Sequence, residues 1–250
     1  MKSKQLALIG KSLSHSFSQS YFTQKFNENS LNDYEYSLFE LATIEELPLL
    51  FEAFPHLIGF NVTIPYKESI IPFLDELDPV AQLLGAVNVV KVIHKNNQRV
   101  LKGFNTDYLG FLATLKPYKT LFKQKVQALI LGTGGASKSV AYCFLLLDIP
   151  FKLVSQKLKN NAIQYHDLTA QMISKYKIIV NTTPLGMFPH INEKPEIPYN
   201  GIQKDTLLID LIYNPEVSSF LQEGIQRGAN IENGLKMLQV QAEESWEIFK

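Results

Sequence analysis

The sequence has a single cysteine, Cys143, and no excess of either charge. One cysteine cannot form an internal disulfide. Because Cys143 lies in an apolar run typical of a helix, we expect a small core residue rather than a reactive thiol. Lysine plus arginine and aspartate plus glutamate each number 24, so the net charge is zero. This balance gives no electrostatic reason to expect binding to nucleic acid or to an anionic membrane.

Long hydrophobic runs are also missing. No apolar stretch reaches the roughly 20 residues that a membrane span needs. Met1–Lys4 leads into a predicted strand without the apolar segment of a signal peptide, so we expect a cytoplasmic protein. His15 has no second ligand at metal-binding spacing, and we expect no metal. The 250 residues are 46% hydrophobic, which suits one large domain or two ordinary ones.

The two halves of the chain differ in their pattern of predicted strands and helices. In the first half, strands at Gln5–Ile9, Tyr34–Leu38 and Ile58–Val62 precede a hairpin of Val87–His94 and Arg99–Phe104. With helices between them, these strands predict an α/β unit with a mixed sheet. From residue 126 onward, apolar strands alternate with helices, which predicts a parallel, doubly wound sheet.

A glycine loop, Gly132-Thr133-Gly134-Gly135-Ala136, joins the first strand of the second half to its first helix. Glycines in this position let the chain turn tightly and bring backbone N–H groups against a pyrophosphate at the helix N-terminus. Given the strand before it and the helix after it, the loop favours dinucleotide binding over a purely structural turn. The second half is therefore predicted to be a Rossmann-like unit.

The end of the next strand indicates which dinucleotide is bound. NAD-binding proteins usually carry an acid there to hold the ribose 2′-hydroxyl. Here the segment is Ser155-Gln156-Lys157-Leu158-Lys159, with no acid and two lysines. This favours the 2′-phosphate of NADP, but no arginine is present for a bidentate contact, so NAD stays an alternative.

Polar groups also follow the strand that ends near Gly59. The Asn61 amide, the Thr63 hydroxyl and the Lys67 ammonium lie close together in sequence, and Pro65 stops further sheet pairing. A loop at a strand end is a common place for a binding site, yet it could equally be a strand-to-helix connection with a solvated lysine. Three other polar segments are Ser14-His15-Ser16, Gly85–Asn88 and Asn105–Asp107.

Taken together and in order, these motifs resemble the shikimate dehydrogenase family. Asn61-Val62-Thr63-Ile64-Pro65-Tyr66-Lys67 resembles its Asn-Val-Thr-x-Pro-x-Lys motif, and Ser14–Ser16 resembles its substrate-carboxylate loop. The segments that match its remaining motifs are Gly85–Asn88, Asn105–Asp107, Gly132–Ala136, Asn181–Met187, Asp210–Pro215 and Gly234–Gln241. The match covers nearly the whole chain.

The resemblance implies a substrate domain of residues 1–106 and 235–250, and an NADP-binding Rossmann domain of residues 107–234. It implies oxidation of a ring hydroxyl of shikimate with hydride transfer to NADP, running in the cell towards shikimate. Lys67 and Asp107 would be catalytic. The implied substrate-binding residues are Ser14, Ser16, Thr63, Lys67, Asn88, Asp107, Tyr213 and Gln241. The implied cofactor-binding residues are Gly132, Gly134, Gly135, Ala136, Ser155, Gln156, Lys157, Thr182 and Gly234.

Three positions depart from the family pattern. The usual Asn-Arg-Thr after the second nucleotide-domain strand is Ser155-Gln156-Lys157, which leaves the strictness of NADP preference open. Gln19 replaces a proline, and Val89 replaces a common threonine. The alternatives are a relative that acts on quinate or an aminated ring, and a non-catalytic metabolite-sensing module.

The last predicted helix, Leu235–Phe249, carries Gln241, a predicted substrate ligand. We therefore expect this helix to return to the first domain, with Met237 and Leu238 as core contacts. The expected partners are shikimate or 3-dehydroshikimate, with no nucleic acid or membrane, in a monomer or homodimer.

Overall fold

The structure, a computed structural model, describes residues 4–13, 16–96, 98–121, 125–159 and 161–250. The chain divides into two compact units. The first consists of Met1–Thr106 with Ala242–Lys250, and the second of Asp107–Gln241. The second compact unit thus extends through Gln241, beyond the return at residue 235 that the sequence suggested. How the functional domains divide the chain stays a prediction.

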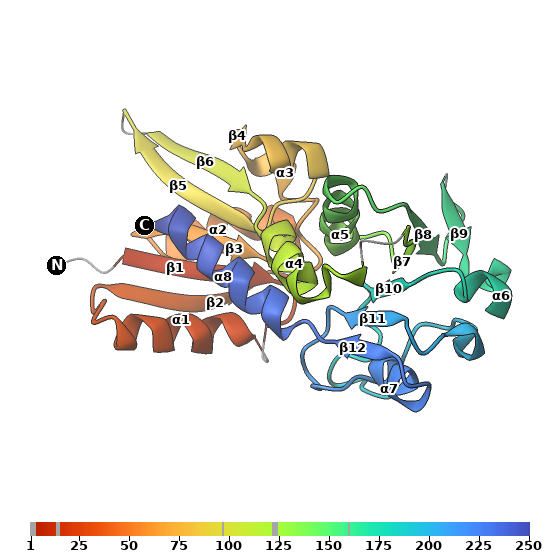
Figure 1. The fold of residues 1–250 in the computed structure, drawn as a ribbon. Helices are drawn as coiled ribbons and strands as arrows, with labels where there is room; N and C mark the ends of the chain where they lie inside the picture. Colours follow the sequence, from red (N-terminus) through yellow and green to blue (C-terminus); the bar gives the residue numbers. More distant parts are fainter. Residues whose placement is uncertain (1–3, 14–15, 97, 122–124, 160) are drawn as a thin grey trace. The chain divides into compact units, whose positions relative to one another are not determined.

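The first unit is built on a mixed sheet, as the sequence predicted (Figure 1). Its strands follow the order β2-β1-β3-β5-β6-β4. The pairs β2–β1 and β1–β3 are parallel, whereas β3–β5 and β5–β6 are antiparallel. The bounds are β1 Lys4–Gly10, β2 Tyr34–Glu40, β3 Leu57–Val62, β4 Glu76–Leu77, β5 Val89–Lys95 and β6 Gln98–Phe104. The predicted hairpin is the β5–β6 pair.

Alternating side chains of β1 fill the cores on the two faces of this sheet. Leu6 and Leu8 pack in the cluster that contains Phe22 of α1 (Phe17–Glu28) and Trp246 near the C-terminus. Ala7 and Ile9 pack in the cluster of α2 (Leu47–Ala53). The short helix α3 (Pro79–Leu84) is capped by Asp78, whose carboxylate accepts from the N–H groups of Val80 and Ala81.

The second unit has a wholly parallel sheet with the order β12-β11-β10-β7-β8-β9. This is the Rossmann order, in which the order of the strands reverses between β7 and β10. The strands are β7 Ala128–Leu131, β8 Phe151–Ser155, β9 Ala162–Gln164, β10 Ile178–Asn181, β11 Leu207–Asp210 and β12 Asn230–Glu232. The prediction of a doubly wound sheet is confirmed. The strand β9, which has three half-buried residues, was not predicted from the sequence.

Helices pack on both faces of the second sheet: α4 Asp107–Leu115 and α5 Gly135–Leu146 on one, α6 Ala170–Ile173 and α7 Ser219–Gln226 on the other. The last helix, α8 Leu235–Phe249, begins in this unit and continues into the first. One core includes Phe111 of α4 and Phe144 of α5, and the other includes Ile173 of α6 and Phe220 of α7. Cys143 is fully buried in the first of these, and burial raises the pKa of its thiol. It is a core residue, as expected.

Met237 corrects one expectation about α8. Its side chain packs in the second-unit core with Phe111, and the Met237 carbonyl approaches so closely that a Cβ at Gly110 would lie 2.4 Å away. Ala242, Trp246 and Phe249, later in the same helix, pack in the first-unit core. The residues of α8 that pack in the first-unit core therefore begin at Ala242, one turn after the predicted contact Leu238.

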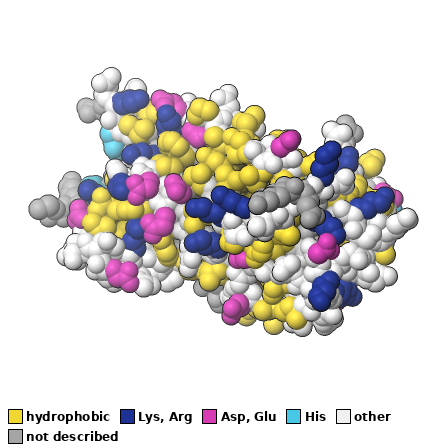
Figure 2. Space-filling model, viewed as in Figure 1, with side chains coloured by type: hydrophobic (Ala, Val, Ile, Leu, Met, Phe, Trp, Pro, Cys, Tyr) yellow, Lys and Arg dark blue, Asp and Glu magenta, His cyan; other side chains and the backbone are white. Residues whose placement is uncertain are grey.

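Among the described residues, no helix combines the length and apolarity needed to cross a bilayer. On the face drawn in Figure 2, basic and acidic side chains are interspersed rather than gathered by sign.

A buried polar network holds the first unit together beneath the predicted substrate loops. The Asn61 carbonyl accepts from the Tyr36 hydroxyl at 2.8 Å. The Asn61 amide nitrogen donates to the main-chain carbonyl of Asn88 at 3.2 Å and to the Ser245 hydroxyl at 3.1 Å. Ser245 and Thr106 hydroxyls lie 3.2 Å apart. Four separate chain segments are thus joined around the side chain of Asn61, a residue that is 5% exposed.

The Asn88 side chain extends this network. Its carbonyl accepts from the Thr106 N–H at 2.7 Å, and its amide nitrogen donates to the Thr106 hydroxyl at 3.0 Å. Asn88 and Thr106 are buried, so these bonds satisfy groups that water does not reach. The network therefore fixes Thr106, which directly precedes the predicted catalytic residue Asp107.

Asn61→Ala should destabilise the protein by about 2–4 kcal/mol, because it leaves the buried Tyr36 hydroxyl and the Ser245 hydroxyl each without one partner. Urea unfolding measures the loss. Asn27→Ala, at an exposed position on α1, is the control and should change stability by less than about 0.5 kcal/mol. Equal effects of the two substitutions would contradict the importance of the network.

A second network lies at the carboxyl ends of β10 and β11. The Asp210 carboxylate accepts from the Ser218 hydroxyl, from the Asn181 amide at 3.0 Å and from the Ile212 N–H at 3.1 Å. The Asn181 carbonyl in turn accepts from the N–H and hydroxyl of Thr183. Burial raises the pKa of Asp210 to about 7, against the opposing effect of these hydrogen bonds.

This shift predicts how stability depends on pH. Between about pH 4 and pH 7 the unfolded chain loses the Asp210 proton while the folded chain keeps it. The group's contribution to stability is complete below about pH 4 and is lost as the pH rises towards 7. Asp210→Asn cannot ionise, so wild-type stability should fall relative to this variant by a few kcal/mol, in order of magnitude, over that range.

Unfolding titrations at several pH values test this prediction. Asp205→Asn is the matched control, because the hydrogen bond from Lys177 lowers the pKa of Asp205. For that pair, wild-type stability should rise relative to the variant as the pH increases through about 4, and then stay level. A constant difference between wild type and Asp210→Asn from pH 4 to pH 8 would refute the assignment.

Candidate functional site

The three polar segments of the first unit meet through backbone and side-chain hydrogen bonds. The N–H of Val87 donates to the carbonyl of Lys67 at 2.7 Å, and the N–H of Val62 donates to the carbonyl of Asn88 at 2.9 Å. The bonds between Asn88 and Thr106 add the third segment. The structure thereby brings together the Lys67, Asn88 and Thr106 segments that the sequence placed far apart.

The loop that carries Thr63 and Lys67 is fastened to the sheet on both sides. The Thr63 N–H donates to the Ile9 carbonyl at 3.0 Å, at the end of β1. The buried Tyr66 hydroxyl donates to the Leu41 carbonyl at 2.6 Å, beyond β2. The peptide bond between Ile64 and Pro65 is cis. Thr63 and Lys67 are half-buried, in a loop that these two hydrogen bonds hold against the sheet.

Asn61 has a structural task in the same loop. The hydrogen bonds of its side chain to Tyr36, Asn88 and Ser245 all reach protein groups, so its amide shapes the loop. Asn88 is 2% exposed and bonded to Thr106, and its predicted role towards substrate stays a prediction.

The serine turn is described only in part. Ser14 lies outside the described residues. Ser16 is the N-cap of α1, and its hydroxyl accepts from the Ser18 N–H at 3.2 Å. Ser16 also lines an open hollow of about 540 Å³ along α1, whose other lining residues, Gln19 to Glu28, include no predicted site residue. The hollow therefore does not add to the candidate substrate site.

The remaining predicted substrate residues belong to the second compact unit. Asp107 begins α4 and is 4% exposed, so its carboxylate lies at a helix N-terminus, where the backbone favours negative charge. Tyr213 follows β11 and is half-buried. Gln241 is on α8, where its amide donates to the Leu238 carbonyl at 3.1 Å.

The glycine loop is placed where a Rossmann unit holds a pyrophosphate. It follows β7, next to β10, where the strand order reverses. Gly132 has a φ of +114°, and a Cβ there would lie 2.6 Å from the Thr182 hydroxyl oxygen. Only glycine suits that backbone. The Thr182 hydroxyl donates to the Leu131 carbonyl at 2.7 Å, which ties the two loops together.

The N-terminus of α5 is suited to an anion. Its N-cap is Gly134, which has no side chain to occupy the first N–H groups, and a Cβ at Gly134 would meet nothing within 4 Å. Open space beside uncapped N–H groups at the start of a helix fits a phosphate. Gly135 and Ala136 form the first turn of this helix. The residues present therefore fit the pyrophosphate of a dinucleotide.

The other predicted cofactor residues have different surroundings. Ser155 is buried at the end of β8, and its hydroxyl accepts from the Lys157 N–H at 3.3 Å. Gln156 and Lys157 are exposed. Gly234 is needed by the chain itself, because a Cβ there would lie 2.0 Å from the Leu211 carbonyl oxygen. Cofactor contacts by these residues and by Thr182 stay predictions.

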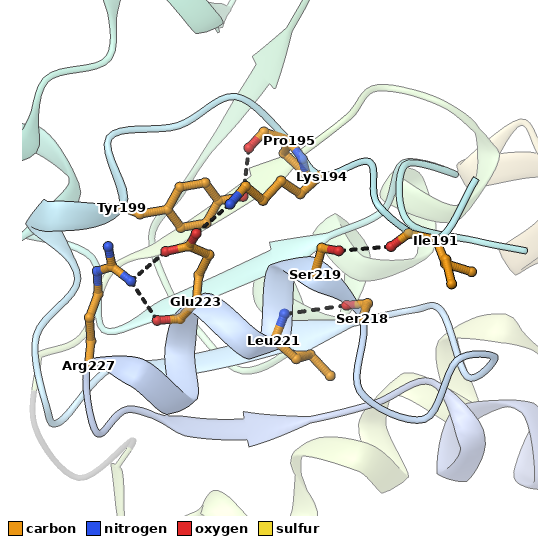
Figure 3. A network of polar contacts seen from close by, with 9 residues as sticks. All are labelled: Ile191, Lys194, Pro195, Tyr199, Ser218, Ser219, Leu221, Glu223 and Arg227. Atoms are coloured by element: carbon orange, nitrogen blue, oxygen red, sulfur yellow. Dashed lines mark hydrogen bonds and ion pairs between the residues drawn. The ribbon is translucent and has the colours of Figure 1, made fainter.

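The loop after β10 is anchored at its far end by an ionic network (Figure 3). Glu223 of α7 pairs with Lys194 from the loop and with Arg227, and these cations hold the pKa of Glu223 below its ordinary value. Lys194 lies over the Tyr199 ring, and the Tyr199 hydroxyl donates to the Pro195 carbonyl at 2.6 Å. The segment that begins with Thr182 is thus held at both ends.

Two contacts near the candidate sites were not predicted from the sequence. Ser245 completes the Asn61 network, and its position four residues after Gln241 on the same helix could have indicated it. Lys159 is one of the two lysines after β8 that favour NADP. In the structure its ammonium donates to the Thr133 hydroxyl of the glycine loop at 3.0 Å. No local spacing pattern predicts such a contact.

Comparison with known proteins places this architecture in one family. Residues 8–90 match the family model described as the shikimate dehydrogenase substrate binding domain. The chain is 35% identical to the shikimate dehydrogenase (NADP(+)) of Methanococcus vannielii, over 99% of this chain and 92% of that protein.

Solved structures agree with the sequence comparison. Shikimate dehydrogenase 1 from Peptoclostridium difficile has a TM-score of 0.82 and 35% identity, covering 100% of this chain and 91% of that one. Shikimate 5-dehydrogenase from Thermus thermophilus, in complex with NADP(H) and shikimate, has a TM-score of 0.84 and 27% identity, covering 100% and 94%. From its motifs, its two sheets and these relatives, the chain belongs to the shikimate dehydrogenase family.

Proposed function

We propose that this protein is an NADP-dependent shikimate dehydrogenase, which reversibly reduces 3-dehydroshikimate to shikimate on the route to chorismate and the aromatic amino acids. One observation carries the proposal. The segments of Lys67 and Asn88 and the residue preceding Asp107 are hydrogen-bonded together in a chain that also has a pyrophosphate-type glycine loop. The family membership supports the same reaction.

The proposed substrate residues match the chemistry of shikimate, a small carboxylate with three ring hydroxyls. Ser14 and Ser16 would bind the carboxylate, since hydroxyl donors suit an isolated anion of this size. Thr63, Asn88 and Gln241 would bind ring hydroxyls, with Tyr213 nearby. Hydroxyl and amide groups can both donate and accept, which lets them discriminate hydroxyl positions on the ring.

Lys67 and Asp107 are proposed as the acid–base pair. The nicotinamide of NADP supplies or accepts the hydride when the cofactor is bound. When the ketone is reduced, the Lys67 ammonium donates a proton to the developing alkoxide, and in the reverse direction its amine accepts the proton of the hydroxyl. The Asp107 carboxylate orients the lysine and the hydroxyl and stabilises the ammonium form.

Lys67→Ala should lower turnover of shikimate with NADP by about a hundredfold or more, because a positioned proton donor typically contributes that much. Asp107→Asn should also lower turnover, because the lysine and the hydroxyl lose the carboxylate that orients them. The rate is followed through the absorbance of reduced nicotinamide. Lys95→Ala is the control, since Lys95 is an exposed residue paired with Glu76 and lies outside the proposed site. It should keep wild-type turnover.

The same assay separates the alternatives. Shikimate and quinate are compared at equal enzyme, each with NADP and with NAD. Preference for shikimate and NADP supports the proposal, and preference for quinate favours the related activity. Ligand binding in a calorimeter without turnover of either substrate would favour a sensing module. Turnover by Lys67→Ala at the wild-type rate would sink the acid–base role. A cytoplasmic location, and a monomeric or homodimeric state, complete the proposal.

A further inference from the structure

A small pocket lies beside the glycine loop in the second unit. Its volume is about 240 Å³, and its lining includes Thr133, Lys138 of α5 and Lys159 from the loop after β8. Apolar side chains, Leu153 of β8 and Ala162 of β9 among them, form other parts of the lining. The pocket therefore combines two lysines with the start of the helix that is suited to the pyrophosphate.

Lys159 is held towards the glycine loop. Its ammonium donates to the Thr133 hydroxyl at 3.0 Å, so the loop after β8 contacts the glycine loop. Lys138 is in the first turns of α5, which begins at Gly135. Two cations from different elements thus line one pocket at the position where the second strand of a Rossmann unit ends.

The chain segment that contains the pocket is basic. Residues 129–166 contain four lysines and a single acid, Asp148, for a net charge of +3. Asp148 follows the C-terminal end of α5, roughly 18 Å along the helix from its start. Within the described part of the chain, no acidic residue lines the pocket. An acid here would bind the ribose 2′-hydroxyl of NAD and repel a 2′-phosphate.

We propose that Lys159 and Lys138 bind the 2′-phosphate of NADP in this pocket and take the place of the arginine that the family carries after its second nucleotide-domain strand. This inference rests on the proposed function. Two ammonium groups supply at least the charge of one guanidinium, without its bidentate geometry. Thr133 acts on Lys159 as a positioning residue, because its hydroxyl accepts from the ammonium.

Binding of reduced cofactors without shikimate tests the assignment directly. NADPH and NADH differ only in the 2′-phosphate, and nicotinamide fluorescence reports the binding of each. Lys159→Ala should weaken NADPH binding about tenfold or more, the effect of losing one charge-assisted hydrogen bond, and change NADH binding less than about twofold. Lys138→Ala should act in the same direction. Adenosine 2′,5′-bisphosphate should compete with NADPH less well in both variants.

Two control variants accompany these measurements. Lys152→Ala removes an exposed lysine of β8 that does not line the pocket, and it should leave the ratio of NADPH to NADH affinity unchanged. Lys159→Arg keeps the charge and should retain most of the preference for NADPH. Thermal unfolding of each variant shows whether the fold is intact, which is expected for an exposed position such as residue 159.

The outcomes separate this inference from the proposed function. Equal weakening of NADPH and NADH by Lys159→Ala would assign the lysine to a part that both cofactors share, and unchanged binding would remove it from the site. Either result overturns the inference while wild-type turnover of shikimate with NADP still supports the function. Wild-type protein that neither binds NADPH nor turns over shikimate would contradict both.

Discussion

The candidate substrate site depends on a single buried amide. Asn61 joins β2, the segment before β5 and the last helix through one carbonyl and one nitrogen. Asn88 continues the connection to Thr106, the residue before Asp107. Because buried polar groups are costly when unpaired, every member of this network restricts the position of the others. The arrangement of the Thr63–Lys67 loop follows from that restriction, together with the Tyr66 bond to Leu41.

The nucleotide unit relies on the same principle at the ends of its parallel strands. Asp210 and Asn181 are both fully buried and hydrogen-bonded, and Asn181 holds Thr183 in the loop that also contacts the glycine loop through Thr182. The glycine at 132 is required by this close approach as much as by its positive φ. The edge of the sheet that is proposed to bind the pyrophosphate is therefore shaped by contacts between segments that follow neighbouring strands.

Much of the fold followed from local pattern, whereas the connections between distant segments did not. The hydrophobic periodicity predicted the last helix with the bounds Leu235–Phe249, and the alternation of strands and helices predicted the parallel sheet. β9 lacked a signal because it is three half-buried residues at a sheet edge. The packing of Met237, the Asn61–Ser245 bond and the reach of Lys159 to Thr133 join residues far apart in sequence. Spacing motifs carry no information about such pairs, and the assignment of residues to the substrate rested on the family resemblance.

The central claim, that this fold transfers hydride between NADP and the shikimate ring, is tested most directly by isotope transfer. The purified protein is incubated with 3-dehydroshikimate and NADPH carrying deuterium at both positions of nicotinamide C4, and the product is examined by mass spectrometry. The account predicts shikimate that contains one deuterium, on the carbon that bore the ketone. Shikimate without deuterium, or no shikimate at all, would contradict it.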